Sequence, residues 1–262
     1  MQKSPPGKAG HIGCCFLSAV GLVYIAYHFR INQIKHKEKL RSDHEIKINN
    51  LENDAFHNQL NPHFIFNSLN TINSFINKNE TATSNQYITK FSKLLRLILE
   101  HSRQRKITLA DELNVVDLYL QVERIRFENK FNYQINIDPD IDADVTEISP
   151  LIIQPFVENA ILHGLLPLLS EGLLQINLQR KNNTLVCIIE DNGIGRSQSI
   201  CNKQFSPKKS KSYGIGTTLK RIELFNKDYN INSPVIITDL VDSNNNASGT
   251  KVEIILAWVQ SF

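Results

Sequence analysis

Cysteine is scarce in this chain of 262 residues, and its four copies are not spaced for metal or disulfide chemistry. Cys14 and Cys15 are adjacent within an apolar run, whereas Cys187 and Cys201 lie far downstream. The absence of any C-x-x-C pair argues against a structural zinc site or a disulfide framework. A reducing compartment therefore suits the globular part of the chain best.

A large excess of charge of either sign is also missing, since 29 basic and 26 acidic residues give a net charge of +3. Residues 1–50 hold 8 basic and 3 acidic side chains, whereas residues 51–262 hold 21 and 23. The bulk of the chain is therefore not a binder of nucleic acid by charge. The basic excess lies beside an apolar segment, which indicates a membrane surface instead. With 41% hydrophobic residues, the composition is that of a globular protein with one large domain or two modest ones.

Long apolar runs are limited to residues 12–29, where the one ionisable side chain is His28. Eighteen residues lie near the lower end of the roughly 17–25 that a membrane-spanning helix needs. Basic residues crowd the C-terminal flank, namely Arg30, Lys35, Lys37, Lys39 and Arg41. This bias predicts a single-pass inner-membrane helix with residues 1–11 outside and the C-terminal side in the cytoplasm. A cleaved signal peptide is the alternative, but no small-residue cleavage site follows the run.

Helical spacing dominates the next part of the chain. Residues 30–54 predict a helical linker that either pairs with a second copy or stands alone as a solvated helix. Residues 55–130 predict a set of helices, and no strand pattern occurs among them. Their expected starts are Asn61-Pro62, Thr83-Ser84 and Thr108, the last with Asp111 at the third position of a capping box.

After residue 130 the hydrophobic period changes to that of strands. Strand patterns occupy residues 131–137, 174–178, 185–189, 235–241 and 252–258. Helices are expected from Ser149-Pro150 to His163-Gly164 and over residues 214–226. Strands and helices mixed in this order predict an α+β sandwich, with helices on one face of a mixed sheet.

The first cluster of chemically capable residues is the segment NPHFIFNSLN, which contains His63 and Asn67. His63 follows an Asn-Pro helix start, and Asn67 lies one turn later on the same face. Imidazole is a competent nucleophile near neutral pH. A single histidine on a helix is more often structural, so this cluster alone leaves both interpretations open.

The second cluster places Glu158, Asn159 and His163 in a segment otherwise made of Leu, Ile, Phe and Val. Asn159 and His163 are four residues apart and share a helix face. Polar groups there either pair with one another in a buried network or face a site. An amide oxygen is a hard ligand that suits Mg²⁺.

The third cluster consists of two glycine pairs, Gly193/Gly195 after a strand and Gly214/Gly216 at a helix start. Glycine lets backbone approach a ligand closely, and a helix N-terminus favours phosphate. The residues between the pairs include Arg196, Lys203, Lys208, Lys209 and Lys211, with no acid. They predict either a mobile lid over polyphosphate or a solvated run of charge.

Taken together, the boxes NPHFIFNSLN, PLIIQPFVENAILHG, DNGIG and YGIG resemble, in that order, the sensor histidine kinases of the Lyt type. The stretch from Thr108 to Phe127 also resembles the helix that precedes the ATP domain in that family. The resemblance covers residues 31–262. It implies a module of phosphoacceptor and dimerisation helices over residues 55–130, followed over residues 131–262 by a Bergerat-type ATP-binding domain.

The resemblance also implies roles for individual residues. His63 would be the phosphoacceptor, Glu158 a second catalytic residue, and Asn159 the Mg²⁺ ligand. Asp191, helped by Thr250, would bind the exocyclic amine of adenine. Gly193 and Gly195 would lie beside the base, and Gly214 and Gly216 near the phosphates. His163 would be a further nucleotide contact. Phe64 follows His63 where many histidine kinases have an acid, so the resemblance assigns no general base.

The sequence thus predicts a homodimeric histidine kinase that uses ATP and Mg²⁺ and phosphorylates an aspartate of a response regulator, expected to be a DNA-binding one. One alternative is a degenerate kinase that binds nucleotide and docks a partner, which the apolar stretch Leu165–Leu169 favours. The other is a Bergerat-fold ATPase in which Glu158 activates water, but hydrolysis has no use for His63.

Overall fold

The computed structural model describes residues 28–33, 35, 62–196, 213–227, 229, 231 and 235–260. The chain divides into two units, Met1–Ala55 and Phe56–Phe262. In the first unit, residues 28–33 and 35 are helical, and most of the predicted membrane span and linker lies outside the described residues. Among the residues that are described, no helix combines the length and the apolar character needed to cross a bilayer.

The second unit begins with a hairpin of two helices, α2 (Pro62–Asn77) and α3 (Thr81–His101). The predicted start at Asn61-Pro62 is confirmed, because the fixed backbone angle of proline and its missing N–H suit the first helical position. The second helix begins two residues before Thr83-Ser84, and Ser84 is buried within it. Aromatic rings hold the hairpin together, and these are Phe64, Phe75, Tyr87 and Phe91.

Helix α4 (Leu109–Arg126) follows the short strand β1 (Ile107–Thr108). The hydroxyl oxygen of Thr108 accepts a hydrogen bond from the backbone N–H of Asp111 at 3.1 Å, which confirms the predicted cap. Strand β1 pairs with β3 (Glu147–Ile148), and a strand in this region was not predicted. Buried side chains lie on all sides of α4, as expected of a helix enclosed between two layers.

The main sheet contains β2 (Phe131–Ile137), β4 (Gly172–Lys181), β5 (Thr184–Asp191), β6 (Ile236–Val241) and β7 (Ala247–Ala257). Its order is β2-β4-β5-β7-β6, with β2 parallel to β4 and the other neighbours antiparallel. The prediction of a mixed sheet is therefore confirmed.

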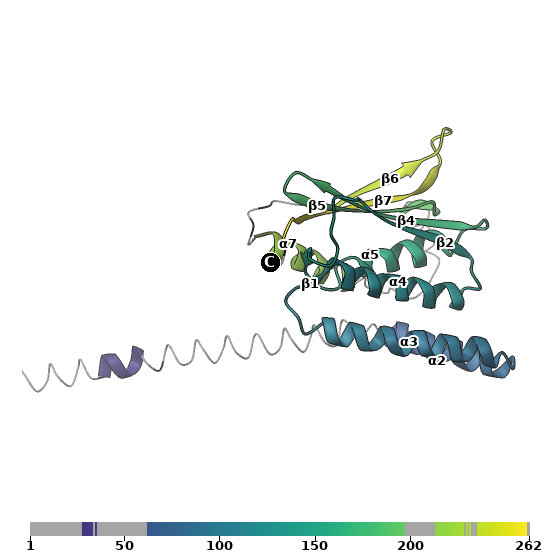
Figure 1. Ribbon diagram of the computed structural model, residues 1–262, viewed down its shortest axis with the longest axis horizontal. Helices are drawn as coiled ribbons and strands as arrows, with labels where there is room; N and C mark the ends of the chain where they lie inside the picture. Colours follow the sequence, from purple (N-terminus) through teal and green to yellow (C-terminus); the bar gives the residue numbers. More distant parts are fainter. Residues whose placement is uncertain are drawn as a thin grey trace, which may run out of the picture. The chain divides into compact units, whose positions relative to one another are not determined.

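Helices α4, α5 (Gln154–Asn159) and α7 (Tyr213–Lys227) cover one face of this sheet, and the α2–α3 hairpin lies on the far side of α4 (Figure 1). A π-helical turn, η1 (Ala160–Leu165), continues α5. The arrangement confirms the predicted α+β class with helices on one face. It also makes α4 the element that separates the hairpin from the sheet.

The start of α5 differs from the prediction. Helix is absent at Ser149-Pro150, because residues 150–153 form a turn in which Leu151 adopts a φ of +55°. The buried carboxylate of Glu112 accepts hydrogen bonds from the backbone N–H groups of Leu151 at 2.7 Å and Ile153 at 2.9 Å. At the other end, the π-helical turn continues one residue past the stop predicted at His163-Gly164.

We expect Glu112→Ala to destabilise the protein by about 2–5 kcal/mol, because it leaves two buried N–H groups without an acceptor at roughly 1–3 kcal/mol each. Thermal or urea unfolding of the purified protein measures this loss. Asp111→Ala is a matched control on the same helix, because the Asp111 backbone N–H that Thr108 caps is retained. Equal stability of the two variants would contradict the role given to Glu112.

Candidate nucleotide-binding and phosphoacceptor site

Asp191, the last residue of β5, carries a buried carboxylate that is held by neighbouring backbone. Its residue is only 4% exposed, and it lies opposite Thr250 of β7 and Leu174 of β4. The Oδ1 atom accepts a hydrogen bond from the backbone N–H of Gly193 at 2.9 Å. Burial raises the pKa of Asp191 to about 6, although the N–H groups of Gly193 and Thr250 favour the charged form.

Three glycines provide the room that this carboxylate occupies. A Cβ atom on Gly164 would lie 2.6 Å from Oδ1 of Asp191, and one on Gly193 would lie 2.5 Å from the same atom. Gly249 has a φ of +141°, and a Cβ there would overlap the carbonyl oxygen of Asp191. Gly193 was predicted as a site residue, whereas Gly164 and Gly249 were missed in that role. In the sequence, the available signals for these two glycines are the dipeptide His163-Gly164 and the tripeptide Ser248-Gly249-Thr250.

The second and third sequence clusters meet at this point. The carbonyl oxygen of Gly164, in η1, accepts a hydrogen bond from the backbone N–H of Ile194 at 3.1 Å. Gly195 adopts a φ of +74°, and a Cβ there would lie 2.8 Å from the Cβ of Ala247 in β7. The glycine turn after β5 is therefore fixed between η1 and β7, with Asp191 enclosed.

The three polar residues of the second cluster are half-buried on α5 and η1. The Nδ2 group of Asn159 donates to the carbonyl oxygen of Pro155 at 2.6 Å. The amide oxygen is thus the end of Asn159 that remains to act as a ligand. Glu158 and His163 both make polar or electrostatic contacts, and the charge of Glu158 acts on Tyr119 and Glu123 of α4.

The second glycine pair lies in the first turn of α7, which begins at Tyr213. In the described part of the chain, no atom apart from the neighbouring residues and backbone of α7 itself lies within 4 Å of where a Cβ of Gly216 would be. Packing against the described residues therefore does not require glycine at this position, in contrast to Gly193.

Arg196, one of the cations of the predicted lid, forms a two-pronged ion pair with Asp239 of β6. Its Nε lies 2.7 Å from Oδ1 and its Nη2 lies 2.9 Å from Oδ2. The end of the glycine turn is thereby attached to the edge strand. The four lysines of the predicted lid lie outside the described residues.

His63 lies in the first turn of α2, as predicted. The next residue, Phe64, is buried, and its ring centroid lies 5.7 Å from that of Phe91 in α3 and 5.5 Å from that of Tyr119 in α4. These contacts fix the backbone of the His63 turn against both neighbouring helices.

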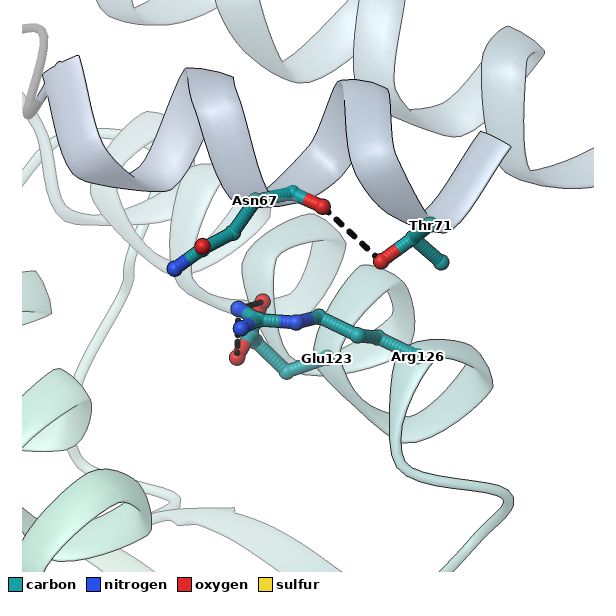
Figure 2. A network of polar contacts seen from close by, with 4 residues as sticks. All are labelled: Asn67, Thr71, Glu123 and Arg126. Atoms are coloured by element: carbon teal, nitrogen blue, oxygen red, sulfur yellow. Dashed lines mark hydrogen bonds and ion pairs between the residues drawn. The ribbon is translucent and has the colours of Figure 1, made fainter. Parts of the chain in front are cut away.

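A polar network lies next to this turn (Figure 2). Nη1 of Arg126 donates to both carboxylate oxygens of Glu123, at 3.2 and 3.3 Å, and the side chain of Asn67 extends from α2 toward this pair. Burial raises the pKa of Glu123 to about 7, whereas the charge and hydrogen bonds of Arg126 lower it. Glu123 and Arg126 lie in the stretch from Thr108 to Phe127 that resembles the kinase family, but the sequence analysis predicted no role for either residue.

Metal-binding potential is limited in this region. Within the described residues, no group of three or more His, Cys, Asp or Glu side chains is arranged to hold a metal ion. A single amide oxygen from Asn159 fits Mg²⁺, which usually keeps several waters and is otherwise held by substrate phosphates.

Comparison with known proteins agrees with the sequence resemblance. The family profile described as "Histidine kinase" matches residues 51–131. The sensor histidine kinase BtsS of Escherichia coli (strain K12) is 34% identical over 200 residues, which cover 76% of this chain and 32% of BtsS. The sensor histidine kinase/phosphatase LytS of Staphylococcus aureus (strain Mu50) is 31% identical over 208 residues, which cover 79% of this chain and 34% of LytS.

The chain thus matches the histidine kinase family over residues 51–131 and is similar, over most of its own length, to sensor kinases of the Lyt type. It spans about a third of the length of the curated relatives that it matches.

The glycines around Asp191 allow a direct test of this geometry. We expect Gly193→Ala to cost roughly 1–3 kcal/mol of stability, because the added methyl group collides with the Asp191 carboxylate and the Gly164 backbone. Gly216→Ala is the matched control and should be neutral or stabilising by up to about 1 kcal/mol, since it adds a helix former in open space. Unfolding curves measure both, and a Gly193→Ala variant as stable as Gly216→Ala would show that the turn is not confined as described.

Proposed function

We propose that this chain is the kinase region of a two-component sensor. It transfers the γ-phosphoryl group of ATP to His63 and passes that group on to an aspartate of a response regulator, expected to be a DNA-binding one. The observation that carries the proposal is the Asp191 site, in which a buried carboxylate is enclosed by glycines, together with the histidine box on α2.

The Asp191 site suits adenine. A buried carboxylate accepts hydrogen bonds strongly, and the exocyclic amine of adenine is a donor of matching chemistry. Guanine presents a carbonyl oxygen at that position, which the carboxylate repels. Gly193, Gly195 and Thr250 line the same end of β5 and β7, so a planar base can approach the backbone closely there.

The phosphates are assigned to the other parts of the site. Gly214 and Gly216 open α7, and a helix N-terminus carries partial positive charge that favours phosphate. Asn159 would contribute its amide oxygen to Mg²⁺, which neutralises phosphate charge when bound. Glu158 and His163, on α5 and η1, are proposed to orient the triphosphate and the ion.

Transfer to His63 would form a bond between a ring nitrogen and the γ-phosphorus while the bond to the bridging oxygen breaks and ADP leaves. The contribution of the protein is to hold the two groups in line. The ring contacts of Phe64 with Phe91 and Tyr119 restrict the backbone that carries His63.

A homodimer is proposed from the surface of α2. Phe66, Leu69 and Ile76 are apolar, follow a helical spacing, and are 65%, 51% and 56% exposed. A second hairpin would cover this face in a four-helix bundle. The proposed setting is the inner membrane, with residues 12–29 as a single span and everything after them in the cytoplasm.

We further propose that the ATP-binding domain includes β1 and α4 and therefore starts earlier than the predicted division at residue 130. Strand β1 pairs with β3, and Glu112 of α4 bonds to the turn before α5. The phosphoacceptor module then consists of α2 and α3.

Incubation of the purified protein with γ-labelled ATP tests the proposed function. We expect acid-labile, base-stable label on the protein, because phosphohistidine has that stability. His63→Gln should abolish the label and leave ATP affinity nearly unchanged, since His63 is not part of the Asp191 site.

The same experiment separates the alternatives. Release of free phosphate without labelled protein would indicate an ATPase, and ATP binding with neither product would indicate a degenerate kinase. Label that persists in His63→Gln would show that another residue is the phosphoacceptor.

A further inference from the structure

The end of α4 that faces α2 contains a buried ion pair whose place in the structure is unusual. Glu123 is fully buried and the side chain of Arg126 is only 16% exposed, although the two are three residues apart on one helix. Pairs at this spacing normally lie on a helix surface in water. Here α2 covers the pair, and Asn67 of α2 extends toward it (Figure 2).

Stability alone is a poor explanation for this pair. Both charges lose water when α2 covers them, and an apolar pair of similar volume is often as stable or more stable. Arg126 does not fully offset the burial of Glu123, because the pKa of that carboxyl remains raised to about 7. Since the two charges lie on the same helix, their attraction also does not hold α2 against α4.

The pair lies between the helix turn that carries His63 and the part of the proposed nucleotide site that contains Glu158. On one side, Asn67 lies one helical turn after His63, and Phe64 packs on Tyr119, one turn before Glu123 on α4. On the other side, the charge of Glu158 on α5 acts on both Tyr119 and Glu123. The charged groups that act on Glu123 are thus Arg126 and Glu158.

We infer that Glu123 and Arg126 form a positioning pair that seats the phosphoacceptor helix on the ATP-binding domain, with Glu123 holding the guanidinium of Arg126 beneath Asn67. The inference rests on the proposed kinase function. Phe64 and Tyr119 supply the apolar contact between α2 and α4. The planar guanidinium of Arg126 fixes the rotation of α2 and its position along α4, which aliphatic packing leaves less defined. Neither residue needs to touch ATP.

The test uses the full chain and the variants Arg126→Met, Arg126→Lys and the double variant Glu123→Gln/Arg126→Met. At saturating ATP, Arg126→Met should lower the initial rate of His63 phosphorylation roughly tenfold or more, the scale expected when reacting groups are misplaced. The KM for ATP should stay within about twofold, because the pair lies outside the Asp191 site. Arg126→Lys, which keeps the charge without the planar fork, should restore only part of the rate.

The matched control is the ion pair of Lys78 with Glu128, at 3.6 Å and with side chains 52% and 80% exposed. It lies just beyond the ends of the same two helices, α2 and α4. Lys78→Met should leave both the rate and the KM unchanged, because exposed pairs contribute little.

The double variant separates a loss of positioning from a loss of folding. Glu123→Gln/Arg126→Met removes both charges together, which avoids a lone buried charge, and it should unfold at a temperature close to that of the unchanged protein. Its rate should be as low as that of Arg126→Met, since the two residues act as a unit. A double variant that is folded and fully active would overturn the inference, as would a KM that rises in proportion to the loss of rate.

Hydrogen exchange gives a readout that does not depend on catalysis. The backbone amides of residues 64–70 should exchange faster in Arg126→Met than in the unchanged protein, while those of the sheet strand β5 should not change. If the unchanged protein carries no label on His63, the proposed function fails. The hydrogen-exchange measurement still tests whether Arg126 positions α2, because it does not depend on phosphorylation. Identical exchange of residues 64–70 in both proteins would show that Arg126 does not position α2.

Discussion

The buried carboxylate of Asp191 is the constraint on which the proposed nucleotide site depends. A carboxylate removed from water is costly unless donors surround it, and here the backbone N–H groups of Gly193 and Thr250 provide them. Those donors come within reach because Gly164, Gly193 and Gly249 leave no side chain in the way. The glycine turn, the π-helical turn and the end of β7 are therefore all arranged around the Asp191 carboxylate. A donor on a ligand would complete the hydrogen bonding of that carboxylate.

Helix α4 connects this site to the phosphoacceptor hairpin through two buried glutamates with different tasks. Glu112 bonds to the turn at residues 151–153 and so fixes where α5, with Glu158 and Asn159, begins. Glu123, about three turns later, faces the hairpin together with Arg126. Helix α4 tolerates these two buried charges because each carboxylate has its own donors.

Much of this fold follows from local patterns in the sequence. Alternating residues in 131–137 and 174–178 became paired strands, because half-buried strands require that period. Thr108 capped α4, and Pro62 began α2, because both effects act within a single turn. The order of motifs was also sufficient to predict the family whose profile the chain matches.

The features that were missed depend on contacts between distant residues. Strand β1 is two residues long, too short to show alternation, and exists through its pairing with β3. The turn before α5 depends on Glu112, 39 residues away from Leu151. Gly164 and Gly249 look like ordinary turn residues until Asp191 is placed beside them. The seat formed by Glu123 and Arg126 could not be recognised because the sequence does not show which helix covers them.

The most direct test of this account is the titration of the Asp191 carboxyl carbon by NMR, with and without an adenine nucleotide. The account predicts a pKa of about 6 in the free protein, because the group is buried. ADP should lower that pKa, since an amine that donates to the carboxylate stabilises its charged form, whereas GDP should not. A pKa near the ordinary value of about 4 in the free protein, or the same shift with both nucleotides, would contradict the account.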